Sequence, residues 1–164
     1  MRVLHLSPSF PPEFRGGVER YVETLCPELE ARGVRCAVLA GSDVRSARDA
    51  GAGELLRERA GSIDVYRARR APEDEHGVDL AHPSLERPID AAVRDFAPDV
   101  AHVHHWLNLG GGLVRRLRAL GVPSVVSLHD AWATCPRFNR VVDERFCELP
   151  LGPATCGPCL APSG

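Results

Sequence analysis

The chain has 164 residues, of which 20 are basic and 22 acidic, so its formal net charge is −2. This length suits one globular domain, and an apolar fraction of 44% provides a core that a disordered chain lacks. A charge close to zero argues against nucleic-acid binding, and the absence of lysine excludes mechanisms that depend on that residue.

The first residues are apolar, but the run is short and ends before Pro8. A secretory signal needs about 7–15 apolar residues, and a membrane-spanning helix needs about 20. We therefore expect a cytoplasmic protein without a transmembrane segment, and association with the membrane periphery stays open. In a reducing compartment the six cysteines are expected to be free thiols, metal ligands or redox groups.

Short apolar runs alternate with helical periods along most of the chain. Strands are expected at 2–7, 34–40, 63–67, 99–104 and 123–128, and helices at 18–32, 85–96 and 113–120, with one or two helical turns at 54–59. This alternation predicts an α/β fold, a Rossmann-like doubly wound and mostly parallel sheet with helices on both faces. We expect this domain to cover residues 1–134, followed by a Cys-rich loop tail at 135–164.

Polar or flexible residues follow three of the expected strands, at 7–17, 104–106 and 129–130. Ligands of such folds bind where strands end, so these segments are candidate site elements. Gly16 and Gly17 precede a helix, where they either present N–H groups to a phosphate or sugar hydroxyl or simply form a tight turn. Glu19 in the first helical turn either stabilises the helix dipole or accepts ligand hydroxyls.

Histidines gather at the ends of two expected strands. His102 and His104 share a face of their strand, so a metal pair there would need a third ligand. We favour a buried His102, with His104 or His105 reaching the cleft. His129, beside Asp130, is placed to bind a hydroxyl or to stabilise a developing charge. A Gly-x-Ser-x-Gly turn is missing, which argues against a Ser-His-Asp hydrolase.

Four segments resemble, in their order and spacing, the amino-terminal half of glycosyltransferase family 4 enzymes. They are RVLH at 2–5, GGVER at 16–20, DVAHVH at 99–104 and SLHD at 127–130. The resemblance implies a GT-B fold and retaining transfer of a sugar from a nucleotide-sugar donor to a hydroxyl acceptor, with no catalytic metal. It also implies that this chain is the acceptor-side domain, with the carboxy-terminal donor-binding domain absent from it and little transfer by the chain alone.

The same resemblance implies roles for individual residues. His129 would contact the transferred sugar near the reacting carbon. Asp130 is the second candidate catalytic residue, because its carboxylate stands beside His129. Gly16 and Gly17 would approach the donor diphosphate or the acceptor. Glu19, His104 and His105 would belong to the acceptor side.

Four cysteines lie in the tail among prolines and glycines, at Cys135, Cys147, Cys156 and Cys159. Four thiols on a segment poor in apolar residues favour a structural zinc, with an iron–sulfur cluster as the alternative metal group. The Cys-x-x-Cys pair also matches a thiol redox tetrapeptide, but too few residues follow for the helix that such a site uses. A non-catalytic, metal-stabilised binding or interaction module is therefore the alternative function.

The remaining cysteines, Cys26 and Cys36, fall on positions that face the expected core. We expect both to act as small apolar residues, and we expect His5 in the first strand to be structural.

Overall fold

The computed structural model describes residues 1–42, 53–71, 82–135 and 137–160. They form two compact units, unit 1 over Met1–Ser127 and unit 2 over Leu128–Gly164. The boundary therefore follows Ser127, whereas the sequence pattern places it after residue 134. Within the described parts of the chain, no helix is long and apolar enough to cross a membrane.

Unit 1 is built on one six-stranded sheet with the order β3-β4-β2-β1-β5-β6. Its strands are β1 (Arg2–Ser7), β2 (Arg35–Ser42), β3 (Leu55–Ala60), β4 (Ile63–Arg69), β5 (Val100–Val103) and β6 (Ser124–Val126). All neighbouring strands are parallel except β3 and β4. The predicted Rossmann-like, mostly parallel sheet is confirmed.

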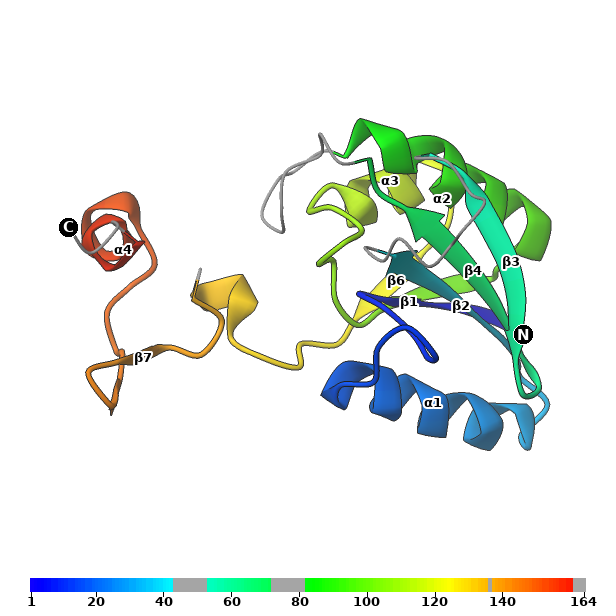
Figure 1. Ribbon diagram of the computed structural model, residues 1–164, viewed down its shortest axis with the longest axis horizontal. Helices are drawn as coiled ribbons and strands as arrows, with labels where there is room; N and C mark the ends of the chain where they lie inside the picture. The colour runs from blue at the N-terminus through cyan, green and yellow to red at the C-terminus, as the bar shows by residue number, and fades with distance from the viewer. Residues whose placement is uncertain (43–52, 72–81, 136, 161–164) are drawn as a thin grey trace. The chain divides into compact units, whose positions relative to one another are not determined.

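Helices cover both faces of this sheet. Helix α1 (Gly17–Glu30) lies on one face, and α2 (Pro83–Phe96) and α3 (Leu113–Ala119) lie on the other (Figure 1). Successive side chains of a strand point to opposite faces of the sheet. Leu4 and Leu6 of β1 therefore pack in the layer of α2 and α3. The layer under α1 holds Val22 and Val38 among its buried apolar residues.

The helical turns predicted at 54–59 are wrong, because this segment forms the edge strand β3. It pairs antiparallel with β4 through a two-residue turn at Gly61 and Ser62, and Gly61 has a φ of 64°. A two-residue turn of this kind favours positive φ and therefore glycine. The charged residues of β3, Arg57, Glu58 and Arg59, are compatible with an edge strand, because an edge strand is only partly buried.

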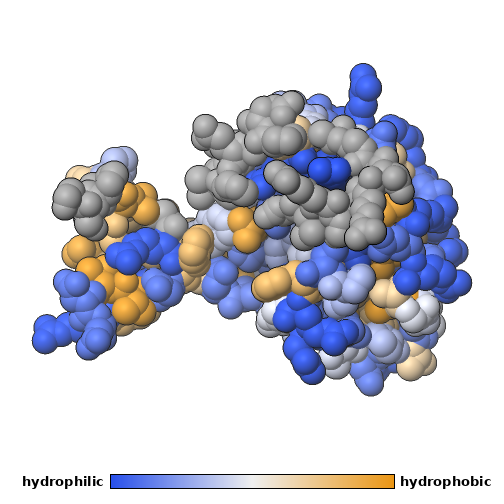
Figure 2. Space-filling model, in the orientation of Figure 1, coloured by the Kyte–Doolittle hydropathy of each residue, from blue (hydrophilic) through white to orange (hydrophobic). Residues whose placement is uncertain are grey.

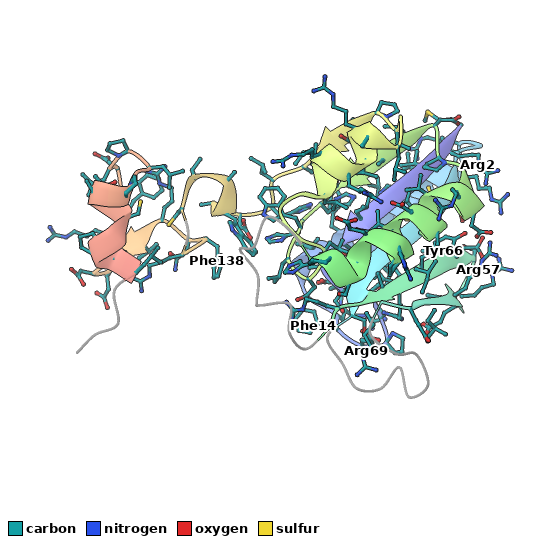
Figure 3. All side chains as sticks on the ribbon, turned by 90° about the horizontal axis from the view of Figure 1, so that it is seen from above. Arg2, Phe14, Arg57, Tyr66, Arg69 and Phe138 are labelled. Carbon is teal, nitrogen blue, oxygen red and sulfur yellow. The ribbon has the colours of Figure 1, made fainter. Side chains whose placement is uncertain are left out.

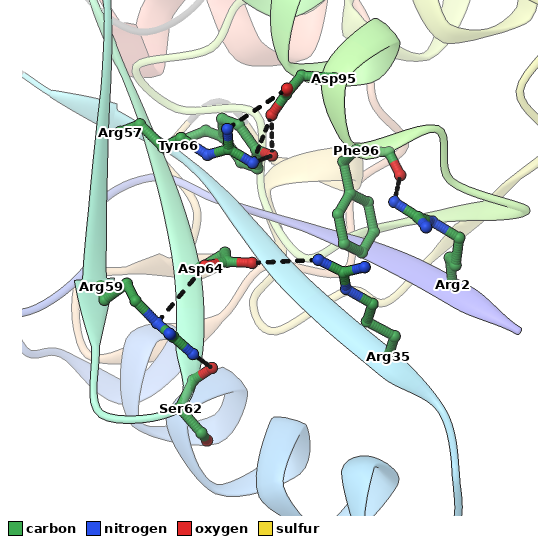
Figure 4. Close-up of polar contacts among 9 residues, drawn as sticks. All are labelled: Arg2, Arg35, Arg57, Arg59, Ser62, Asp64, Tyr66, Asp95 and Phe96. Carbon is green, nitrogen blue, oxygen red and sulfur yellow. Dashed lines mark hydrogen bonds and ion pairs between the residues drawn. The ribbon is translucent and has the colours of Figure 1, made fainter.

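Polar contacts join α2 to β4 at the end of the sheet where β1 begins (Figure 4). Tyr66 Oη donates to Asp95 Oδ2 at 2.5 Å, and Arg57 Nη2 lies 2.7 Å from the same oxygen. Burial, with the hydrogen bond to Asp95, raises the pKa of Tyr66 to about 12. Arg2 Nη2 donates to the carbonyl of Phe96. This end of unit 1 is thus held together by internal pairs.

Unit 2 contains more regular structure than the predicted loop tail. It has a 3-10 helix, η1 (Trp132–Thr134), a short hairpin of β7 (Val141–Val142) and β8 (Arg145–Phe146), and helix α4 (Pro153–Leu160). Arg140, just before β7, ties the two ends of the hairpin together. Its guanidinium donates to the Cys147 carbonyl at 2.7 Å and to the Leu149 carbonyl at 2.9 Å, both of which follow β8. Apolar side chains gather on the surface of this unit (Figure 2).

Candidate functional site

A cavity of about 290 Å³ lies in unit 1 where β1 and β5 end. Its lining residues come from the loops that follow these strands and from the start of α1: Pro8, Ser9, Glu13, Phe14, Glu19, Leu107 and Asn108. Figure 3 shows Phe14 at this end of unit 1, with Arg2 and Arg57 toward the opposite end. The carboxyl ends of parallel strands are the expected position for a ligand.

The first turn of α1 closes one side of this cavity. Glu19 is 2% exposed, and its Oε2 accepts the backbone N–H of Gly16 at 2.9 Å. A Cβ on Gly16 would lie 2.8 Å from Glu19 Oε2 and 2.8 Å from Phe14 Cε1, so a larger residue there would require these side chains to shift. A Cβ on Gly17 would meet no atom within 4 Å. Gly16 thus packs closely against the side chains of Phe14 and Glu19, whereas open space lies beside Gly17.

Glu13 is a cavity residue that the sequence analysis did not select. Its Oε1 accepts the hydroxyl of Ser42 at 2.9 Å, and its Oε2 lies 3.6 Å from Arg67 Nη1. Both charged side chains are nearly buried, with 7% of Glu13 and 2% of Arg67 exposed. The cavity therefore holds two fixed carboxylates, Glu13 and Glu19.

Arg67 holds the loop that carries Glu13 against the sheet. Its Nη1 donates to the carbonyl of Phe10 at 2.9 Å, its Nη2 donates to the carbonyl of Pro11, and its Nε donates to Glu58 Oε2 at 2.7 Å. An arginine in the middle of a buried strand signals such a role, because a buried guanidinium needs several acceptors.

Asn108 joins the loops that follow β1 and β5. Its Nδ2 donates to the carbonyl of Pro8 at 3.1 Å, and its φ of 63° lies in a region that asparagine tolerates better than most residues. Both loops press on Gly41 near the end of β2. A Cβ there would lie 2.6 Å from Asn108 Cβ, 2.8 Å from Asn108 O and 2.9 Å from Pro8 O.

His104 and His105 stand at the start of the loop that follows β5. Both are buried, with 1% and 8% of their surfaces exposed. His104 Nε2 lies 3.1 Å from His5 Nδ1, and His105 Nδ1 accepts the backbone N–H of Leu107 at 2.9 Å. The residues that line the cavity include neither histidine. Their predicted acceptor-side role stays a prediction.

His102 in β5 and His104, the residue that follows β5, lie side by side, with ring centroids 4.0 Å apart. The third imidazole that a metal would need comes from His5 on the neighbouring strand. Ligand nitrogens of the three histidines lie within 4.8 Å of one another. His102 Nε2 also lies 2.8 Å from the Ser127 hydroxyl. Because His5 Nδ1 already pairs with His104, and His102 with Ser127, we assign no metal to this set of three histidines.

His129 and Asp130 belong to unit 2, whereas Gly16, Gly17 and Glu19 belong to unit 1. Asp130 Oδ1 accepts the backbone N–H of Trp132 at 2.8 Å, which fixes the start of η1. The catalytic roles of His129 and Asp130 stay predictions.

All four tail cysteines line one cavity of about 410 Å³ within unit 2. Arg137 Nη1 donates to Cys159 Sγ at 3.5 Å, and this contact raises the pKa of the guanidinium. Among the described residues, the sets of three with ligand atoms within 4.8 Å all lie in unit 1. The tail sulfurs therefore share a cavity but do not form such a close set.

Residues 15–151 match the family model Glycosyltransferase Family 4. The chain belongs to this family. The family assignment confirms the resemblance drawn from the sequence and identifies a glycosyltransferase-type domain. The sequence matches no curated protein.

A solved structure with a similar fold is sucrose-phosphate synthase from Thermosynechococcus elongatus. The two share 14% sequence identity and a TM-score of 0.52 over 79% of this chain. The family 4 chain spans 33% of that structure, about one third of its length. At this identity the likeness supports the Rossmann-like fold of unit 1 and leaves substrate to be argued from the site.

Proposed function

We propose that this chain is the acceptor-side domain of a retaining glycosyltransferase. The enzyme would move a sugar from a nucleotide-sugar donor to a hydroxyl acceptor, with the donor bound mainly outside this domain. Six cysteines without a disulfide suit a reducing compartment such as the cytoplasm.

The observation that carries this proposal is the composition of the 290 Å³ cavity. Glu13 and Glu19 present carboxylate oxygens and Asn108 presents an amide, all of which can accept hydrogen bonds from sugar hydroxyls. None of the residues lining the cavity is basic, so the cavity suits a polyhydroxylated acceptor better than a nucleoside diphosphate. Phe14, which is 59% exposed, offers an aromatic face to a sugar ring.

The chemistry needs little acid–base help from this domain. The acceptor hydroxyl attacks the anomeric carbon, the bond to the diphosphate breaks, and the leaving phosphate takes the hydroxyl proton. His129 would contact the transferred sugar, with Asp130 beside it. Glu19 accepts the Gly16 N–H, so the other backbone N–H groups near Gly16 and Gly17 would stabilise charge that develops on the donor diphosphate or would hold the acceptor.

Glu19→Gln tests the acceptor site with little disturbance of α1, because glutamine also forms a capping box at this position. We expect neutral hexoses or disaccharides to show saturation transfer in NMR with the 164-residue chain. The variant should bind the same sugar about tenfold more weakly, since hydrogen bonds to charged groups contribute about 1.5–3 kcal/mol.

Glu28→Gln is the matched control, since it removes the same charge from an exposed position of the same helix. It should leave sugar binding unchanged. Equal binding by the Glu19→Gln variant and the wild type would contradict the proposed acceptor site.

The four tail cysteines favour a second candidate, a metal-stabilised module. We propose that Cys135, Cys147, Cys156 and Cys159 bind a structural zinc, or an iron–sulfur cluster, as the staple of unit 2. Their common cavity supports this assignment, and metal binding would draw the four sulfurs together. Helix α4 contains Cys156 and Cys159 rather than following them, which does not favour the redox alternative.

Removing Cys156 and Cys159 together as serines should release about one metal ion per chain. Elemental analysis of protein purified without chelator measures this loss and separates zinc from iron. Thr155→Ser, at a residue that lines the same cavity, should keep the metal content of the wild type. A double variant that retains all of its metal would remove this candidate.

A further inference from the structure

Two cysteines and a histidine meet in the interior of unit 1. His5 comes from β1, Cys26 from α1 and Cys36 from β2, and they are 0%, 0% and 2% exposed. Their ligand atoms, one nitrogen and two sulfurs, all lie within 4.8 Å of one another. Three potential metal ligands from three different elements thus converge at one point.

The arrangement of these elements explains why the three side chains meet. His5 pairs with Val38 across the β1–β2 ladder, and Cys36 lies two residues before Val38 on the same face. Helix α1 covers this face and brings Cys26 down onto it (Figure 1). The rest of this layer is apolar, with Val22 among its buried residues.

His5 has one ring nitrogen in use and one without a partner. Nδ1 lies 3.1 Å from His104 Nε2, whereas the buried Nε2 of His5 has no hydrogen-bond partner among the described residues. A buried polar atom without a partner costs free energy, so its presence in an apolar layer calls for an explanation.

A metal bound at Nε2 would give His5 a partner at each ring nitrogen, since Nδ1 already pairs with His104. Coordination through Nε2 requires the proton to be on Nδ1, where it is donated to His104. A second partner of this kind commonly fixes the tautomer of a metal-ligating histidine. His104 would then position His5 without touching the metal.

The two sulfurs lie within 4.8 Å of each other, and Cys36 Sγ donates to the carbonyl of Val34 at 3.9 Å. Both sulfurs therefore lie close to the His5 ring within the layer under α1.

The geometry points to a buried metal site formed by His5, Cys26 and Cys36, which would hold a thiophilic d¹⁰ cation, Zn²⁺ or Cu⁺. Two sulfurs and one imidazole nitrogen form a soft donor set, which such ions prefer and which Mg²⁺ and Ca²⁺ do not. This site is separate from the acceptor cavity, and it is independent of the proposed transferase function.

The test uses the full chain with the four tail cysteines replaced by serine, so that Cys26 and Cys36 are the remaining thiols. The protein is dialysed against Zn²⁺, or against Cu⁺ without oxygen, and its metal content is measured. We expect about one ion per chain with at least one of these metals, and competition between them identifies the preferred ion. No retained ion with either metal would overturn the inference.

Cys36→Ala in this background should abolish metal binding. Val38→Ala is the matched control, because it truncates a buried residue of the same strand and layer but removes no ligand. It should be less stable but should keep its ion. Equal metal content in the two variants would also overturn the site.

A cobalt spectrum keeps the test decisive if Cys36→Ala does not fold. The tail variant, with its core unchanged, is titrated with Co²⁺. We expect the near-ultraviolet charge-transfer band that thiolate ligands give to cobalt. Its absence would contradict a site that contains Cys26 and Cys36.

Discussion

Replacing Arg67 with methionine is expected to lower the free energy of unfolding by about 3–5 kcal/mol, the usual effect of removing one partner of a buried ion pair. The side chain is 2% exposed and lies against Glu13 and Glu58. Without it, Glu13 would lose the cation that pairs with it among the described residues, and the carbonyls of Phe10 and Pro11 would lose their donor. Urea unfolding at neutral pH measures the change.

Arg59→Met is the control for this prediction. Arg59 belongs to the edge strand β3, is 69% exposed and lies 3.6 Å from Asp64. An exposed pair of this kind contributes little, so the variant should differ from the wild type by less than about 1 kcal/mol. If the two methionine variants were equally stable, Arg67 would not anchor the loop that carries Glu13.

Most of the fold could be predicted because the elements have clear hydrophobic periods. The parallel strands and the three helices of unit 1 follow from apolar runs and from stripes such as the one on α1. Strand β3 could not be predicted from hydrophobicity, because an edge strand needs few apolar residues. The signal for it was the short turn at Gly61 and Ser62 between 55–60 and 63–69.

The candidate site was predicted only where it depends on local sequence. Strand ends indicated the loop with Gly16 and the helix turn with Glu19, and both border the cavity. Glu13 and Asn108 were missed, because the loops that carry them meet only in the folded sheet.

Long-range register explains the remaining differences. Each of His5, Cys26 and Cys36 reads as an ordinary core residue in its own element. The pairing of β1 with β2 and the packing of α1 over both bring their ligand atoms within 4.8 Å of one another.

Gly41→Ala is expected to destabilise unit 1 by about 1–3 kcal/mol, as is typical when an atom is inserted into a packed interior. The added Cβ would lie 2.6 Å from Asn108 Cβ, and it would also meet the backbone oxygens of Asn108 and Pro8 at 2.8 and 2.9 Å. Backbone atoms cannot turn away as a long side chain can, so the loops themselves must move. Urea unfolding gives the cost, and weaker sugar binding should accompany it, because Pro8 and Asn108 line the cavity.

Gly17→Ala makes the same chemical change where the structure leaves room. Its Cβ would meet no atom within 4 Å, and alanine is favoured over glycine in helices by up to about 1 kcal/mol, so stability should stay equal or rise. The two substitutions should therefore shift the urea midpoint in opposite directions or differ clearly in size. A Gly41→Ala variant as stable as Gly17→Ala would mean that the loops after β1 and β5 do not close on β2, and the cavity between them would lose its structural basis.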